Sequence, residues 1–204
     1  MKTKQFLLIL LACLCFPFAQ LWSNPVNGLL ERIDSGASKK FIIQVKKGQS
    51  DFFELDQKGD KVVIRGNNYV NIATGLNWYL KYYAGIHLSW NGMTAELPES
   101  LPKVSTPVRK ETNLALRYDF NYCTYSYTMA FWDWERWEKE IDWMALHGIN
   151  LPLAVVGQEC VWKNMLEKLG YTKEEINKFI AGPAFLYNPQ IEMFARFKMK
   201  SSFH

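Results

Sequence analysis

The residues with the clearest chemical potential lie in one aromatic-rich stretch of the chain, residues 117–157. Ten of the residues from Tyr118 to Trp143 are aromatic, far more than an ordinary core needs. Polar residues stand at two places in or beside this stretch: around Asn121, and at Gln158 and Glu159. Aromatic rings beside amide and carboxylate groups suit a pocket that stacks against flat ligand faces, sugar rings included. These polar residues are therefore the first candidates for a binding site.

The pattern of apolar residues predicts the elements that must position these polar groups. An apolar and aromatic segment at residues 116–122 precedes an amphipathic stretch at residues 133–147, and residues 151–156 form a continuous apolar run. The middle stretch predicts a helix that begins after Asp133 and ends at Gly148. A continuous apolar run is typical of a strand buried on both faces, and strand–helix–strand order predicts parallel pairing. Both polar groups then follow the carboxyl ends of neighbouring strands.

The predicted helix at residues 133–147 has an apolar and a charged face. We expect its buried stripe to contain Trp134, Trp137, Ile141, Met144 and Ala145, and its solvent face to contain Glu135, Arg136, Glu138, Lys139, Glu140 and Asp142. Ion pairs are expected at i,i+4 spacing, Glu135 with Lys139 and Arg136 with Glu140. Each such pair contributes only about 0.2–0.5 kcal/mol, so the apolar stripe must decide how the helix docks.

A second unit of the same kind follows. Residues 160–169 predict a helix that Gly170 ends, and its apolar face is expected to hold Val161, Trp162, Met165 and Leu169. Thr172 then begins a short helix with a capping-box pattern. Alternation of strand and helix predicts an α/β fold, either the opening of a (β/α)8 barrel or a doubly wound sheet.

A small α+β domain is predicted before this region, over residues 24–111. Helices are expected at residues 27–33 and 68–83, and strands at residues 41–45, 52–55, 61–65 and 86–90. Residues 57–60 predict a hairpin turn between the second and third of these strands. Pro98, Pro102 and Pro107 indicate an exposed linker up to about Glu111. No acid, base or nucleophile arrangement stands out, which favours an accessory domain.

The composition excludes several classes of protein. The chain has 204 residues with 24 Lys+Arg against 20 Asp+Glu, and a net charge of +4 without a basic stripe does not favour nucleic-acid binding. Only three histidines occur, far apart, so neither a metal site nor a histidine-based triad is expected. No glycine-rich phosphate loop is present, and no cofactor is expected. Cys123 and Cys160 each follow a predicted strand, so a disulfide between them is one option and two small buried thiols the other.

Residues 1–23 have the pattern of a targeting segment. Lys2 and Lys4 precede an almost wholly apolar run at residues 6–18, which is too short for a comfortable membrane span. We therefore expect export to the periplasm, the cell surface or the medium, and no membrane-spanning helix. Residues 10–13 are similar to a lipoprotein box, so a lipid anchor at Cys13 is possible, with ordinary cleavage near Ala19 or Ser23 as the alternative.

Long strings of this region resemble one enzyme family. The strings are RYDFNYCTYSYT, FWDWERWEKEIDWMALHGINLPLA, GQE followed by VW, and INKFIAGPAFL, in this order. They resemble the start of the catalytic domain of the alpha-N-acetylglucosaminidase family of glycoside hydrolases, and residues from Asn24 onward resemble its N-terminal domain more loosely. The resemblance implies a (β/α)8 catalytic barrel, a retaining mechanism through two glutamates, and glycans with terminal alpha-linked N-acetylglucosamine as substrates.

The same resemblance implies where a sugar would bind. Asn121 and Cys123 match positions that line the pocket for the terminal sugar: an amide both donates to and accepts from hydroxyls, and a small thiol leaves room for the ring. Gln158 and Glu159 match a family string at the second strand end. For Asn121 the alternative is a strand-end turn residue, and for Glu159 a carboxylate favoured at a helix N-terminus.

The departures from the family pattern concern the catalytic acids. Retaining hydrolysis needs two carboxylates about 5–5.5 Å apart, and nothing in this sequence matches the strings around the family's two glutamates. Residues 114–204 number only 91, whereas a whole barrel takes about 250 residues. The similarity ends near Leu186, which leaves residues 187–204 as a divergent tail. We therefore expect a truncated or frame-disrupted product that does not hydrolyse glycosides alone; the alternative is a non-catalytic carbohydrate-binding or surface module.

Overall fold

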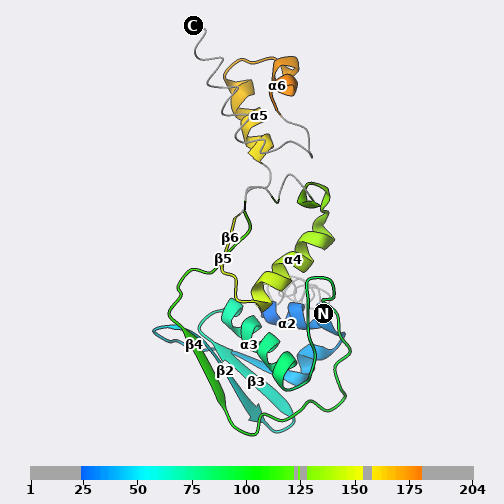
Figure 1. The fold of residues 1–204 in the computed structure, drawn as a ribbon, viewed down its shortest axis with the longest axis vertical. Coiled ribbons are helices and arrows are strands. Elements are labelled where there is room, and N and C mark those ends of the chain that lie inside the picture. The colour runs from blue at the N-terminus through cyan, green and yellow to red at the C-terminus, as the bar shows by residue number, and fades with distance from the viewer. Residues whose placement is uncertain (1–23, 122–123, 125–127, 154–157, 181–204) are drawn as a thin grey trace, which may run out of the picture. The chain divides into compact units, whose positions relative to one another are not determined.

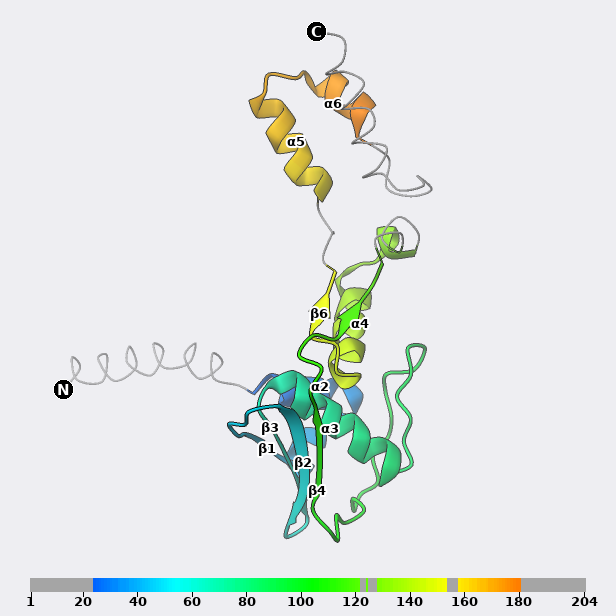
Figure 2. The same ribbon diagram turned by 60° about the vertical axis from the view of Figure 1, so that its left-hand side comes forward.

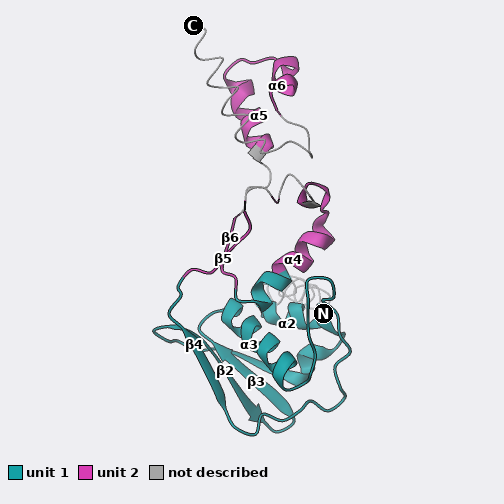
Figure 3. Cartoon of the chain, viewed as in Figure 1, with its two compact units in different colours: residues 1–115, 142–148 teal, residues 116–141, 149–204 magenta. Residues whose placement is uncertain are grey.

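The computed structural model describes residues 24–121, 124, 128–153 and 158–180. The chain divides into two units, residues 1–115 with 142–148, and residues 116–141 with 149–204 (Figure 3). The division crosses a single helix, α4 (Trp134–Leu146), whose last turns are grouped with the first unit. The signal segment and the C-terminal tail expected from the sequence lie outside the described residues.

A four-stranded sheet forms the base of the first unit. Its strands are β1 (Phe41–Val45), β2 (Asp51–Lys58), β3 (Lys61–Gly66) and β4 (Val108–Thr112), in the order β1-β3-β2-β4 (Figure 1). β1 pairs parallel with β3, while β2 pairs antiparallel with both β3 and β4. The β2–β3 hairpin turns at Gly59, whose φ of 63° lies in the left-handed region that favours glycine.

Two helices pack with this sheet. Helix α2 (Pro25–Ile33) begins at Asn24, whose side chain accepts a hydrogen bond from the amide of Val26, and a short 3-10 helix, η1 (Ala37–Lys40), follows it. Helix α3 (Tyr69–Tyr82) begins at Asn68 and lies across one face of the sheet (Figures 1 and 2). The apolar core forms between these layers, and its fully buried members include Leu30, Leu55, Val62, Ile64, Ile72, Leu76, Tyr79 and Leu80.

The structure confirms most of the elements predicted for this unit and corrects two. Both predicted helices, the first three strands and the hairpin are present, within a few residues of the expected bounds. The strand predicted at residues 86–90 is wrong: the only pairing described there is an isolated bridge between Ser89 and Gly92. Leu88 is nevertheless buried, so its side chain anchors the segment in the core without a strand.

The exposed linker predicted up to Glu111 is also wrong. Leu97, Leu101 and Val104 are buried in the core, and residues 108–112 form the edge strand β4. The backbone of this segment also has a hydrogen bond to the core, because the carbonyl of Pro102 accepts from the hydroxyl of Tyr79 at 2.7 Å. Prolines prevent regular structure here, but they do not prevent the apolar residues between them from being buried.

The second unit contains a parallel pair of short strands and several helices. β5 (Tyr118–Asp119) pairs parallel with β6 (Leu151–Pro152), as predicted. Between them lie the short 3-10 helix η3 (Thr128–Phe131) and helix α4, and after them come α5 (Gln158–Lys168) and α6 (Lys173–Phe179) (Figure 1). The predicted helix ends at Gly148 and Gly170 are confirmed, with φ of 79° and 87°, and Thr172 forms the predicted capping box with Glu175. The start of α5 differs from the prediction, because the helix begins at Gln158, two residues before the expected position.

The buried faces of the new helices differ from the prediction. On α4, Met144 and Leu146 are buried, but Trp134 is 69% exposed and Ile141 is exposed, while the predicted solvent residues Glu140 and Asp142 are buried. On α5, Leu166 is buried, whereas Val161 and Met165 are exposed, as is Leu169 directly after the helix. Leu151 is exposed too, so the prediction of a strand buried on both faces is wrong at this residue. A two-stranded sheet offers too little apolar surface to cover these side chains.

Candidate functional site

The parallel pairing of β5 and β6 defines a sheet edge that the candidate segments follow in the chain. Tyr118 is opposite Leu151 and Asp119 is opposite Pro152. The amide of Arg117 donates to the side-chain oxygen of Asn150 at 2.8 Å, and the carbonyl of Asp119 accepts from the amide of Leu153 at 3.1 Å, which sets the register. Both strands therefore run in the same direction, and the segments that carry the predicted site residues follow their carboxyl ends.

The chain leaves β5 through a strained residue. Phe120 has a φ of 68°, in the left-handed region that bulky residues rarely adopt. Its amide donates to the side chain of Asp119 at 2.7 Å, which supports the sharp turn. Such a conformation costs about 1–3 kcal/mol, and it turns the backbone out of the strand directly before Asn121.

Asn121 is exposed and organises the loop that it begins. Its Oδ1 atom accepts hydrogen bonds from both the amide and the hydroxyl of Thr124, each at 3.2 Å. This is the strand-end turn role that the sequence left open, so the structure shows how Asn121 is held. Contact of its amide with a sugar stays a prediction.

The structure gives less information on the other three predicted site residues. Cys123 lies outside the described residues, and with it the question of a Cys123–Cys160 disulfide; the thiol of Cys160 itself is exposed. Gln158 is the first residue of α5, and Glu159 is exposed in its first turn. The helix N-terminus stabilises the carboxylate of Glu159, which agrees with the structural alternative for this residue. Contact of either residue with substrate stays a prediction.

The predicted ion pair between Arg136 and Glu140 is confirmed, but the sequence did not predict that it belongs to a cluster with two tryptophans before and in α4. The guanidinium of Arg136 lies 3.9 Å from the ring centre of Trp132, and the ring of Trp137 meets that of Trp132 edge to face at 5.0 Å. On its other side Arg136 donates to Glu140 at 2.9 Å. The signal was present in the sequence, since Trp132, Arg136 and Glu140 recur every four residues, but Glu140 was expected on the solvent face.

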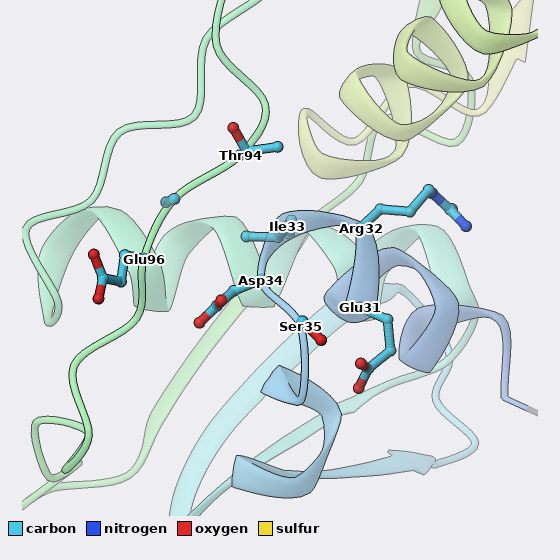
Figure 4. Close-up of a pocket in the computed structure, with 8 residues that line it drawn as sticks. Glu31, Arg32, Ile33, Asp34, Ser35, Thr94 and Glu96 are labelled. Carbon is cyan, nitrogen blue, oxygen red and sulfur yellow. The ribbon is translucent and has the colours of Figure 1, made fainter.

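A separate hollow of about 480 Å³ lies in the first unit, between the end of α2 and residues 94–96 (Figure 4). The carboxylate of Glu31 accepts from the hydroxyl of Ser38 and the amide of Gly36, and these hydrogen bonds hold the pKa of Glu31 below its usual value. Asp34 accepts from the amide of Leu97 at 3.0 Å. Both carboxylates thus hold loops in place, which leaves the strand ends as the better candidate site.

The described residues contain no group of three metal-ligating side chains. In the same part of the chain, every helix falls short of the length and apolar character that a bilayer crossing requires.

Two family models match the chain, and together they cover most of it. The "Alpha-N-acetylglucosaminidase (NAGLU) N-terminal domain" matches residues 24–103, and the "Alpha-N-acetylglucosaminidase (NAGLU) tim-barrel domain" matches residues 117–203. The second match runs farther than the similarity that we recognised in the sequence, which ended near Leu186. The fold is therefore an α+β N-terminal domain followed by the first βα units of a (β/α)8 barrel.

Similar proteins agree with these matches. The chain is 48% identical to the human alpha-N-acetylglucosaminidase over 168 residues, which cover 79% of this chain and 23% of the human protein. It is also similar to solved structures of a family 89 glycoside hydrolase from Clostridium perfringens. One is in complex with 2-acetamido-1,2-dideoxynojirmycin (TM-score 0.72, 40% identity), and another with its substrate GlcNAc-alpha-1,4-galactose (TM-score 0.74, 41% identity).

Each clostridial comparison covers 79% of this chain and 19% of the solved chain. The present chain thus spans about a quarter of the human relative and a fifth of the bacterial one. Within that span the order of the two domains agrees with the family models, and the sequence identity is 40% or more. The chain belongs to the alpha-N-acetylglucosaminidase family of glycoside hydrolases.

Proposed function

We propose that these 204 residues are the N-terminal part of an exported glycoside hydrolase that removes terminal alpha-linked N-acetylglucosamine from glycans with retention of configuration. The observation that carries this proposal is the parallel β5–β6 pair, because the segments that contain Asn121 and Glu159 come after the carboxyl edge of this pair in the chain. Sites of barrel enzymes lie at that edge. The solved clostridial relative in complex with GlcNAc-alpha-1,4-galactose supports the choice of sugar.

In this proposal the described strand ends bind the terminal sugar and form part of the wall of its pocket. The two catalytic carboxylates are not among these 204 residues. Asn121 and Cys123 contact the terminal sugar, and Gln158 and Glu159 line the neighbouring strand end. Retaining chemistry requires one carboxylate as nucleophile and another as acid and base, about 5–5.5 Å apart. The clostridial substrate complex carries glutamine in place of two glutamates, which accords with such a pair. No segment of the present sequence matches the strings around the family's glutamates, so the isolated chain is expected to be inactive.

A test separates binding from hydrolysis. The purified chain is incubated with a chromogenic alpha-N-acetylglucosaminide, and binding of free N-acetylglucosamine is followed by saturation-transfer NMR. We expect no release of the sugar and weak binding, with a Kd of about 1 mM, which is equivalent to roughly −4 kcal/mol. Measurable release would overturn the proposed inactivity. A folded chain without detectable binding would overturn the role of the two strand ends.

A matched pair of variants locates the binding. Asn121→Ala removes the amide at the strand end and should weaken binding about tenfold, the effect of one or two lost hydrogen bonds. Asn177→Ala removes an exposed amide on α6 and should leave binding unchanged. If Asn121→Ala and the unchanged chain bind N-acetylglucosamine with equal affinity, Asn121 does not belong to the binding site. Cooperative melting of both variants confirms that they are folded.

Export is the remaining part of the proposal, and it is supported by residues 1–23 alone. N-terminal sequencing of protein from a secreting host checks it. Mature protein that begins at Cys13 and incorporates labelled fatty acid indicates a lipid anchor, whereas a start near Asn24 indicates ordinary cleavage. Recovery of the unprocessed chain would contradict export.

A further inference from the structure

The last turns of α4 are held by a bidentate ion pair to the N-terminal helix α2. The Nε atom of Arg32 lies 2.6 Å from Oδ2 of Asp142, and its Nη2 atom lies 2.7 Å from Oδ1. The side chain of Asp142 is only 11% exposed, and the two residues are 110 positions apart in the sequence. Paired in this planar geometry, a guanidinium and a carboxylate form one of the stronger hydrogen-bonded contacts in proteins.

Helix α3 supplies partners for the C-terminal carbonyls of α4. The last four carbonyls of a helix have no partner within it. The carbonyl of Leu146 accepts from the side-chain amide of Asn77 at 3.2 Å. The hydroxyl of Thr74, which lies 2.9 Å from the carbonyl of Val70 in its own helix, also lies within 3.4 Å of the carbonyl of Ala145. Thr74 and Asn77 are three residues apart on α3, so they belong to one face of that helix.

Apolar burial completes the contact. Leu146 has no exposed surface and belongs to the same core cluster as Leu30, Leu76 and Leu80. Ala145 packs against that cluster, and Met144 is buried as well. Gly148 is buried, and its φ of 79° allows the chain to turn directly after the helix.

We propose that α2 and α3 form a docking surface for the C-terminal turns of the first barrel helix, so that residues 142–148 fold cooperatively with the N-terminal domain. The surface formed by α2 and α3 binds the C-terminal end of α4, which presents backbone carbonyls and the carboxylate of Asp142. The carboxylate of Asp142 lies near the C-terminus of α4, where the helix dipole disfavours a negative charge. The ion pair with Arg32 offsets this unfavourable interaction. This docking holds whether or not the chain binds a sugar.

Hydrogen–deuterium exchange on the complete chain tests the docking directly. If residues 142–148 open only when the N-terminal domain opens, their amides exchange as slowly as those on the buried face of α3. Exchange at residues 142–148 as fast as in α5, with α3 still protected, would overturn the proposal without any variant.

Substitutions then test the ion pair. Arg32→Ala should raise the rate of amide exchange about tenfold, because loss of Arg32 leaves the buried Asp142 without its cation. If the two regions fold cooperatively, the rate rises by the same factor at residues 142–148 and in α3. Lys139→Ala, on the exposed face of the same helix, should change either rate by no more than about twofold. Faster exchange at residues 142–148 alone, or no change at all, would contradict cooperative folding. If Arg32→Ala does not fold, the exchanged pair Arg32→Asp with Asp142→Arg decides: restored protection supports the docking, and its absence overturns it.

Discussion

Arg136 and Glu140 are one turn apart on α4, with Nη2 of the arginine 2.9 Å from Oε2 of the glutamate, and the Glu140 side chain is only 2% exposed. A second pair with the same spacing, Glu135 and Lys139, lies 2.9 Å apart on the same helix but is exposed. The two pairs differ in burial and not in spacing. They therefore allow the effect of burial on an ion pair to be measured within one helix.

We expect Arg136→Ala to cost much more stability than Lys139→Ala. Loss of Arg136 removes an ion-pair partner of a buried carboxylate, which costs about 3 kcal/mol, whereas loss of Lys139 removes an exposed pair worth roughly 0.5 kcal/mol. Urea denaturation followed by circular dichroism measures both. Equal effects of the two substitutions would show that burial of Glu140 does not matter for this pair.

Gly75 is expected to be intolerant of a methyl group. A Cβ atom there would lie 3.0 Å from both Cβ of Phe53 and Cγ2 of Ile64, so Gly75→Ala should destabilise the first unit by about 1–3 kcal/mol through overpacking. Gly28→Ala is the control, because its methyl group would meet only Nη1 of Arg32, at 3.4 Å, which is an ordinary contact distance. That change should stabilise α2 by up to roughly 1 kcal/mol through helix propensity. Thermal melts of both variants measure the difference between their stabilities. A higher melting temperature of Gly75→Ala than of the unchanged chain would contradict the prediction.

Tyr79 should make the fold sensitive to alkali. Burial, with a smaller contribution from Tyr83, raises the pKa of Tyr79 to about 12 from its usual value near 10. A pKa that is raised on folding means that the neutral phenol stabilises the fold; this contribution is complete below pH 10 and is lost as the pH rises through 12. Stability should therefore fall between these values, and less steeply in Tyr79→Phe. Denaturant melts across this range provide the measurement, and identical slopes for the two proteins would contradict the prediction.

Glu54 should have the opposite effect at acid pH. Partial burial raises its pKa, but hydrogen bonds from Lys46 and Arg109 outweigh burial and hold the pKa below the usual value. A lowered pKa contributes stability above the ordinary carboxyl range and loses it as the pH falls through the lowered value. Glu54→Gln should flatten the acid limb of the stability curve, while Glu99→Gln, at an exposed position, should not. An unchanged acid limb in Glu54→Gln would exclude this role.

Local sequence signals predicted the elements well because each depends on a few neighbouring residues. Asn68 and Thr172 begin helices with their own side chains, and Gly59, Gly148 and Gly170 occupy left-handed positions that other residues disfavour. The parallel pairing of β5 and β6 also followed from sequence, since a helix between two strands requires a crossover. For the candidate site, the position of Asn121 just after β5 was predictable from the end of the apolar segment, whereas contact of Asn121 and Glu159 with a sugar stays a prediction.

The tertiary structure decided which faces are buried and what the charges do. Periodicity places Glu140 and Asp142 opposite the apolar stripe, yet both are buried, because Arg136 and Arg32 compensate their charges. The partner of Asp142 is 110 residues away, so no local pattern reveals it. The sequence by itself determined the family, the helix ends and the strand direction. Only three-dimensional packing joined the last turns of α4 to the N-terminal core, because burial depends on contacts between segments that are distant in the chain.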